Sequence, residues 1–392
     1  MRANPGGQLS STEVIGRDKD IKRIWRSLER QSVILVSERR IGKTSILKKM
    51  RDDAGDSKVI YFRDLEGIIS PLDFVETVLR DVQAHLGVKQ KTAIKFQKLI
   101  AHVAGLEVGA AGFAVKLPQV AASHWKELLQ NVIDDLMDDD DDAVVYFFWD
   151  EIPLMLYNIK QIAGEPVAME ILDTLRSLRQ THYRLRMVFT GSIGLHHVLS
   201  SLRKTRYAND PTNDMDLIDV LPLEVENATE LCRLLLEGEN LVPTQREQFA
   251  SVAALAVDGF PFYIHHLVDE LSRNEGVTKP EQLQDVILTA MTDPQDRWHL
   301  RYYRERIDIY YSEEERPLAL ACLDVLSSQS SLAFDELLNF VRHDLTDAGA
   351  EALRDLLWRL MRDHYVLQAA NGKYQFRFAL IKRAWQMQRG KQ

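Results

Sequence analysis

One stretch decides the fold: Ser32-Val-Ile-Leu-Val-Ser-Glu-Arg-Arg-Ile-Gly-Lys-Thr-Ser45. Its residues 33–36 are apolar and mostly β-branched, which is typical of a buried parallel strand. A polar turn follows, and residues 45–51 have the composition of a helix. Backbone N–H groups in such a turn can surround a phosphate, and the start of the helix adds a partial positive charge. The stretch therefore predicts a phosphate-binding loop.

The loop fits the pattern G-x-x-x-x-G-K-[ST] at every fixed position except the first, where Ser37 replaces glycine. Lys43 is expected to reach the β- and γ-phosphates of ATP, and the Thr44 hydroxyl to bind Mg²⁺. An exposed basic turn is the simpler alternative, but it does not explain Gly, Lys and Thr in this order at a helix start. The residues expected to contact ATP are Ser37, Glu38, Arg39, Arg40, Ile41, Gly42, Lys43, Thr44 and Ser45.

Composition limits the class of protein. The chain has 392 residues, 45% hydrophobic and 27% charged, which predicts two or three soluble domains. No apolar run approaches the ~20 residues of a membrane span, and the first eight residues lack a signal-peptide core. Cys232 and Cys322 are too few for a disulfide framework, so a reducing cytoplasm is expected. The net charge of −9 argues against binding dominated by sequence-independent contacts with nucleic acid.

A second motif lies at Ala143-Val-Val-Tyr-Phe-Phe-Trp-Asp150-Glu151. An apolar strand that ends in Asp-Glu is the Walker B pattern. Asp150 is expected to hold Mg²⁺, and Glu151 to orient and deprotonate the attacking water. Many strands end in two acids, but few follow a phosphate-binding loop, so the two motifs together predict nucleotide hydrolysis.

The first half of the chain alternates strands with helices, which predicts a parallel sheet with right-handed crossovers. A glycine-rich segment, 105–117, is expected to be a β-hairpin. It is either a local packing flap or a contact element for DNA or another subunit. Further strands are expected at 59–62, 186–192 and 220–223, and helices at 71–86, from about 92, at 125–137 and at 167–183.

The second half reads differently. Residues 224–292 are expected to be all helical, around the element Gly259-Phe-Pro261, followed by a charged connecting helix at 297–316. His265 and His266 are expected to be packing or surface residues of a helix and not catalytic. Three amphipathic helices and a hairpin then predict a winged helix: 318–326, 334–341 and 350–361, with a turn at Asn371-Gly372.

The order of these motifs resembles the archaeal-type branch of the STAND ATPases, relatives of the origin-recognition initiators within the AAA+ group. The shared motifs are Gly16-Arg17, the Arg-Arg-Ile-Gly-Lys-Thr-Ser loop, Trp-Asp-Glu, Thr-Gly-Ser, Leu221-Pro-Leu223, Gly-Phe-Pro and a final Phe-Arg-Phe strand. The resemblance implies an additional strand between Walker A and Walker B, with Thr190 or Ser192 as sensor 1. It also implies that Gly16 and Arg17 lie near the adenine, and that Pro261 faces the nucleotide from a helical lid. Ser37 and the lack of a clear sensor-2 arginine depart from the family pattern, and both are expected to affect hydrolysis more than nucleotide binding.

The expected architecture is an α/β P-loop core of the additional-strand type at 1–223, with an insertion at about 66–138. An all-α lid at 224–295 and a connecting helix with a winged helix at 296–392 complete it. The expected function is an ATP-hydrolysing switch in which nucleotide state changes the arrangement of core, lid and winged helix. An arginine finger is expected from a neighbouring subunit, through a protein partner or self-association, or from the lid, with Arg203 and Arg206 as candidates.

Two other functions remain open: a DNA loader of the AAA+ type, and a scaffold that binds ATP tightly with little turnover. The presumed recognition helix carries Arg354, Arg359 and Arg362 among Glu351, Asp355 and Asp363. A DNA reader should present a mostly basic face, so contact with protein, or regulation of the lid, is favoured over contact with DNA.

Overall fold

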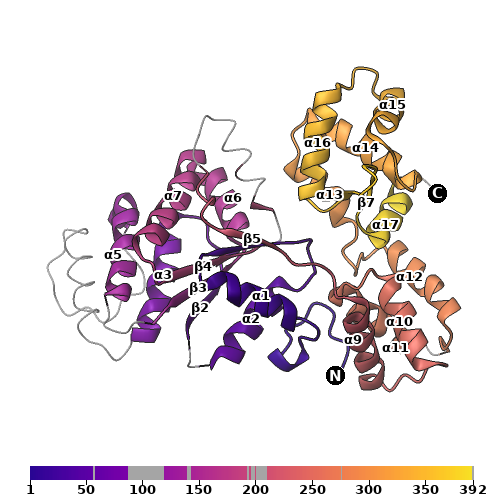
Figure 1. Ribbon diagram of the computed structural model, residues 1–392, viewed down its shortest axis with the longest axis horizontal. Helices are drawn as coiled ribbons and strands as arrows, with labels where there is room; N and C mark the ends of the chain where they lie inside the picture. The colour runs from indigo at the N-terminus through magenta and orange to yellow at the C-terminus, as the bar shows by residue number, and fades with distance from the viewer. Residues whose placement is uncertain are drawn as a thin grey trace. The chain divides into compact units, whose positions relative to one another are not determined.

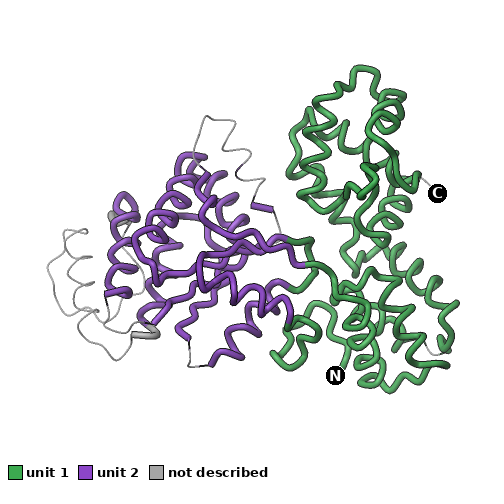
Figure 2. Tube along the Cα trace, in the orientation of Figure 1, with its two compact units in different colours: residues 1–18, 37–42, 221–392 green, residues 19–36, 43–220 purple. Residues whose placement is uncertain are grey.

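The computed structural model describes residues 1–55, 58–86, 119–138, 143–191, 194, 195, 199, 210–274 and 276–390. It divides into two compact units (Figure 2). Unit 1 comprises Met1–Asp18, Ser37–Gly42 and Leu221–Gln392, and unit 2 comprises Lys19–Val36 and Lys43–Val220. The division into core, lid and winged helix stays a prediction. None of the described helices combines the length and the apolar character that a membrane crossing requires.

Unit 2 is built on a five-stranded sheet in the order β2-β3-β4-β1-β5 (Figure 1). Every neighbouring pair is parallel, so the carboxyl ends of all strands lie at one edge. β4 lies between β1 and β3, which confirms the predicted additional-strand P-loop core. The strands are β1 (Val33–Val36), β2 (Val59–Asp64), β3 (Val145–Asp150), β4 (Leu185–Phe189) and β5 (Asp216–Asp219).

The predicted last strand, 220–223, is wrong in position. β5 ends at Asp219, and only Val220 continues the pairing, through its N–H to the carbonyl of Val36 at 2.9 Å. Pro222 has no N–H to offer a neighbouring strand. β5 was not predicted because only its two central residues are apolar and both its ends are aspartates.

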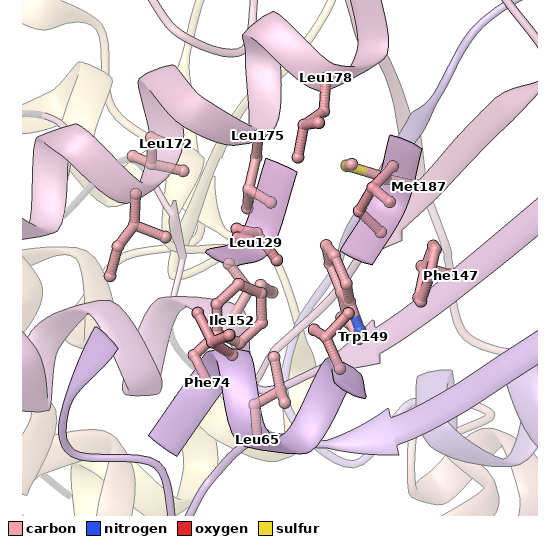
Figure 3. Packing of buried hydrophobic residues seen from close by; sticks show 14 of the residues in the cluster. Leu65, Phe74, Leu129, Phe147, Trp149, Ile152, Leu172, Leu175, Leu178 and Met187 are labelled. Atoms are coloured by element: carbon pink, nitrogen blue, oxygen red, sulfur yellow. The ribbon is translucent and has the colours of Figure 1, made fainter. Parts of the chain in front are cut away.

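Helices cover both faces of this sheet. On one face, Trp25 of α1 (Asp18–Leu28) packs against Tyr146 and Phe148 of β3. On the other face, Phe147 and Trp149 of β3 enter a core formed with the helices that follow (Figure 3). The remaining helices of unit 2 are α2 (Lys43–Ala54), α3 (Pro71–Leu86), α5 (Trp125–Met137), α6 (Ile152–Ala163) and α7 (Glu165–Thr181). The helix predicted from residue 92 and the hairpin at 105–117 lie outside the described residues.

Unit 1 is mostly helical. The prediction of an all-helical segment after residue 224 is confirmed by α9 (Val225–Gly238), α10 (Arg246–Ala256), α11 (Pro261–Arg273) and α12 (Leu283–Thr292). The unit also contains two short 3₁₀ helices, η1 (Ser11–Glu13) and η4 (Pro280–Gln282). Its remaining elements are α13 (Tyr302–Tyr310), α14 (Glu315–Ser328), α15 (Phe334–Asp344), α16 (Ala350–Arg362), β6 (Val366–Gln368), β7 (Tyr374–Phe376) and α17 (Ala379–Arg389).

The connecting helix predicted over 297–316 is shorter, because turns interrupt it at both ends. Before α13, His299 adopts φ +53°, and the carboxylate of Asp296 accepts the N–H of Leu300 at 2.9 Å. After α13, the hydroxyl of Ser312 accepts the N–H of Glu315 at 3.3 Å, which starts a new helix.

The predicted C-terminal elements are present. β6 and β7 pair in antiparallel fashion, and Gly372 in their turn adopts φ +79°. The indole of Trp385 is buried and donates to the carboxylate of Asp324 on α14 at 2.8 Å. The sequence of three helices and a hairpin fits a winged helix, and that identification stays a prediction.

Candidate nucleotide-binding site

The loop after β1 has the backbone that its glycine implies. Arg40 adopts φ +70° and Gly42 φ +98°, both in the left-handed region. Gly42 has open space around it, so its conformation and not crowding requires glycine there. Ser37 does not lie in the left-handed region, and its hydroxyl donates to the carbonyl of Glu38 at 3.1 Å. A serine therefore fits the first position of the loop without backbone strain.

The start of α2 meets the end of β3 within unit 2. Lys43 is the first residue of the helix and is buried. The hydroxyl of Thr44 donates a hydrogen bond to the carboxylate of Asp150. Burial raises the pKa of Asp150 above its ordinary value, although the hydrogen bond from Thr44 and the charge of Lys43 act in the opposite direction. The two predicted magnesium ligands are thus in contact.

These two oxygen donors suit Mg²⁺, which prefers carboxylate, hydroxyl and water ligands. No group of three or more His, Cys, Asp or Glu side chains that could hold a metal occurs in the described part of the chain. Proteins commonly hold Mg²⁺ with one or two side chains, and phosphate and water complete the octahedron. Thr44 and Asp150 fit that arrangement.

Asp64 is a neighbour of this site that the sequence analysis did not single out. It ends β2 and is paired in register with Asp150 on β3. Its charge contributes to the raised pKa of Asp150. The sequence did contain a signal for this residue, since the predicted strand at 59–62 is followed by an aspartate. Neighbouring parallel strands place their carboxyl ends side by side, so this aspartate was a candidate neighbour of Asp150.

Glu151 and Thr190 follow the ends of neighbouring strands. Glu151 adopts φ +59°, an uncommon conformation for a residue with a side chain, at the N-cap of α6. The N–H of Thr190 donates to Trp149 at 3.1 Å, and its carbonyl accepts the N–H of Ile152 at 3.2 Å. The Thr190 hydroxyl is buried and has no hydrogen-bond partner among the described residues. It is therefore free for a water or phosphate oxygen.

Gly191 keeps the two segments close. A Cβ at this position would lie 2.7 Å from Pro153 and 3.3 Å from the carboxylate of Glu151. The structure thus brings the predicted catalytic Glu151 beside the chain segment of Thr190. Ser192, Arg203 and Arg206 lie outside the described residues.

Within unit 1, the Gly16-Arg17 element supports the loop backbone. The buried guanidinium of Arg17 donates to the carbonyl of Ile41 at 2.7 Å and to that of Leu221 at 2.8 Å. Gly16 adopts φ +72°, and a Cβ there would lie 2.5 Å from Asn227. The predicted proximity to adenine stays a prediction, but the contact with the loop is direct.

The Gly-Phe-Pro element lies against the chain that precedes α9. The N–H of Leu223 donates to the carbonyl of Gly259 at 3.0 Å, and a Cβ on Gly259 would lie 2.6 Å from the carbonyl oxygen of Leu223. Pro261 is the first residue of α11, where its missing N–H costs nothing. The next residue, Phe262, lies under the guanidinium of Arg40, 4.3 Å from its ring centroid. Pro261 therefore precedes a residue that contacts Arg40 of the phosphate-binding loop. The contact of Pro261 with nucleotide stays a prediction.

His265 and His266 of α11 are both buried. The expectation of packing residues is therefore met, and that of surface residues is wrong. The N–H of Asn4 donates to Nδ1 of His265 at 3.1 Å, which requires a neutral ring in this geometry. Burial lowers the pKa of each ring to about 4. Both are therefore neutral packing residues at neutral pH.

Comparisons with solved structures find the same fold. A Walker-type ATPase of Pyrococcus abyssi aligns over 98% of this chain and 100% of its own, at 15% identity and a TM-score of 0.66. The ORC2 protein of Aeropyrum pernix, solved with ADPNP and ADP, covers 95% of both chains at 10% identity and a TM-score of 0.53.

A STAND protein of Pyrococcus horikoshii with a tetratricopeptide repeat sensor also matches, but at a TM-score of 0.40 and over 43% of its length. No protein-family profile matches the sequence. A search of curated proteins found no match. The topology and the two whole-chain similarities together give this chain the fold of the ORC-like P-loop ATPases of the AAA+ type.

Proposed function

We propose that the protein binds ATP with Mg²⁺ and hydrolyses it at the β–γ phosphoanhydride bond. One observation carries the proposal: Thr44, Asp150, Glu151 and Thr190 converge at the carboxyl edge of three adjacent strands of unit 2. Ligands of open parallel sheets bind at that edge. A basic turn without a phosphate ligand would not need these side chains together.

The residues have distinct roles in this proposal. Lys43 and the N–H groups of the loop offset the negative charge that develops on the phosphoryl oxygens. Thr44 and Asp150 hold the metal, which would neutralise phosphate charge when bound. Glu151 orients a water molecule and accepts its proton, while the buried hydroxyl of Thr190 fixes that water or the γ-phosphate.

Nucleotide state is proposed to act on the chain beyond the loop. Loop residues contact the second half of the chain directly, since Arg39 lies over Tyr302 of α13 and Arg40 over Phe262 of α11. A loop that reshapes around phosphate would disturb both contacts. We therefore propose a switch of the STAND/AAA+ kind, in which core, lid and C-terminal winged helix change their arrangement with the nucleotide.

A partner is expected to complete the site. Transition-state charge in P-loop ATPases is often offset by an arginine from another molecule. Self-association would supply it here through Arg203 or Arg206 of a second copy, whereas a different protein partner would supply an arginine of its own.

The two buried free cysteines fit a reducing cytoplasm.

Steady-state phosphate release with ATP and Mg²⁺ tests the proposal, with EDTA as the control. Turnover that EDTA removes is the expected result. If neither turnover nor binding of a fluorescent ATP analogue is found, the proposal is wrong. Binding without turnover would favour the alternative of an ATP-binding scaffold.

A further inference from the structure

A buried ion pair joins the phosphate-binding loop to α13 within unit 1. Oε1 of Glu38 lies 2.7 Å from Nη1 of Arg306, and the side chains are 1% and 5% exposed. The same oxygen accepts the backbone N–H of Arg39 at 2.7 Å. The N–H of Arg39 is therefore already hydrogen-bonded to a carboxylate, in a loop whose N–H groups bind phosphate in this fold.

Arg306 is in turn held from the C-terminal part of the chain. Its Nη2 lies 3.5 Å from the carbonyl oxygen and 3.9 Å from the carboxylate of Asp363, the residue that follows α16. The hydroxyl of Tyr311 donates to the same carboxylate, and the ring of Tyr365 lies 5.2 Å from the guanidinium. Burial alone disfavours the charged guanidinium, but Glu38 and its other neighbours raise the pKa of Arg306 well above its ordinary value. The guanidinium of Arg306 is thus charged.

The next two loop side chains are also held by the second half of the chain. Arg39 lies 4.1 Å from the ring centroid of Tyr302, and Arg40 lies 4.3 Å from that of Phe262. Nε of Arg40 is buried and makes no hydrogen bond within the described residues. Two cations next to the expected phosphate site therefore lie against aromatic rings, and within the described ranges no ion pair of either side chain is found.

We propose that the Glu38–Arg306 ion pair is a latch that holds the loop in an arrangement that nucleotide binding must displace. The latch rests on the proposed ATP site. A triphosphate repels the carboxylate of Glu38, competes with it for the loop N–H groups, and attracts Arg39 and Arg40 away from their rings. Because Arg306 also contacts Asp363, release of the pair changes the contacts at the end of α16.

The test uses the double variant E38Q/R306Q in the full chain. Removing Arg306 alone would leave the buried carboxylate of Glu38 without its cation, which is strongly destabilising, whereas the double change keeps neutral hydrogen-bonding groups at both positions. Asp363 loses the same cation but keeps its hydrogen bond from the hydroxyl of Tyr311. The matched control is R304Q/D308N, which removes an exposed ion pair of 2.6 Å from the same helix without touching the loop. The conservative variant R306K keeps the positive charge and serves as the test if the double variant does not fold.

Binding of a fluorescent ATP analogue with Mg²⁺ is the first readout. If the latch closes about nine molecules in ten, the double variant should bind about tenfold more tightly than the parent. The lysine variant should lie between them, and the control should match the parent. Unchanged or weaker binding by E38Q/R306Q and by R306K would show that the pair prepares the loop for nucleotide, and the latch would be wrong.

Hydrogen exchange without nucleotide is the second readout, and it does not depend on the proposed function. Loss of the pair should speed exchange of the Arg39 amide about tenfold relative to the parent and to R304Q/D308N, because its acceptor is no longer held in place. Equal protection in all chains overturns the latch. If no chain binds the analogue, the proposed function fails, while exchange still decides whether the pair holds the loop.

Discussion

The hydroxyl of Thr44 at the start of α2 donates a hydrogen bond to the carboxylate of Asp150 at the end of β3. The two residues are 106 positions apart in the sequence and belong to the two motifs that the sequence analysis paired. Their contact requires β1 and β3 to end at the same edge of the sheet, with β4 between them. The contact is also what a shared magnesium ion would need.

Replacing Glu151 by glutamine should stop hydrolysis and leave nucleotide binding intact. The amide keeps the size of the carboxylate but cannot accept the proton of the attacking water. General bases contribute about 10²–10⁴-fold, so kcat for phosphate release should fall by that factor. Glu170→Gln on the exposed part of α7 is the matched control. Hydrolysis at the parent rate in Glu151→Gln would remove Glu151 from the catalytic role.

ATP with Mg²⁺ should raise the melting temperature of the parent chain, because it binds the folded state alone. At a ligand concentration about a hundred times Kd, the gain is on the order of 2.7 kcal/mol. Lys43→Ala should abolish the gain, since it removes the cation that lies buried at the start of α2. Lys49→Ala on the same helix is the control. A parent chain that melts at the same temperature with millimolar ATP contradicts the nucleotide site.

Replacing Asp150 by asparagine should stabilise the fold at neutral pH while it weakens magnesium-dependent turnover. Burial raises the pKa of Asp150 in the folded state, so folding favours the protonated carboxyl. That preference contributes stability at pH values below the unfolded pKa, and the contribution is lost as pH rises through the folded pKa. Ionisation of the Asp150 carboxyl therefore lowers the free energy of unfolding at pH 7.

Melting temperatures of parent and Asp150→Asn, measured from pH 4 to pH 8, check this sign. The advantage of the variant should be largest at pH 7 to 8 and shrink as the solution is acidified. Asp52→Asn removes the same charge from an exposed position of α2 and should show no such trend. An advantage that grows on acidification would mean that the carboxylate, and not the carboxyl, is the favoured form.

Much of this arrangement is local in sequence, and that part was predictable. The apolar runs of β1 and β3 and the period of α3 each lie within one short segment, so these elements and the Walker residues could be predicted. The place of β4 between β1 and β3 was implied by the resemblance to additional-strand ATPases and not by local composition. β5 was misplaced because its register depends on β1 and not on its own composition. The contacts of Glu38, Arg39 and Arg40 could not be predicted, since their partners follow more than 200 residues later and pair through side chains alone.

The last prediction separates a switch from a DNA loader. Arg354 pairs with Glu351, and Arg359 pairs with Glu315 and lies over the ring of Tyr311. Two arginines of α16 are thus engaged within the protein, and the chain carries a net charge of −9. Any duplex binding should rest on a few phosphate contacts, be weak, and fall steeply as salt rises.

Fluorescence anisotropy of a labelled duplex at ~150 mM salt, with and without ATP, measures this directly, because phosphate contacts weaken at that ionic strength. The variant R354A/R359A/R362A removes three positive charges from α16, and R23A/R26A/R30A removes the same number from exposed positions in and just after α1. A switch predicts little binding by any chain and no ATP effect. A loader predicts tight, ATP-dependent binding that the α16 variant loses and the α1 variant keeps, because only contacts of a recognition helix would be removed. That second pattern would place DNA loading ahead of the switch.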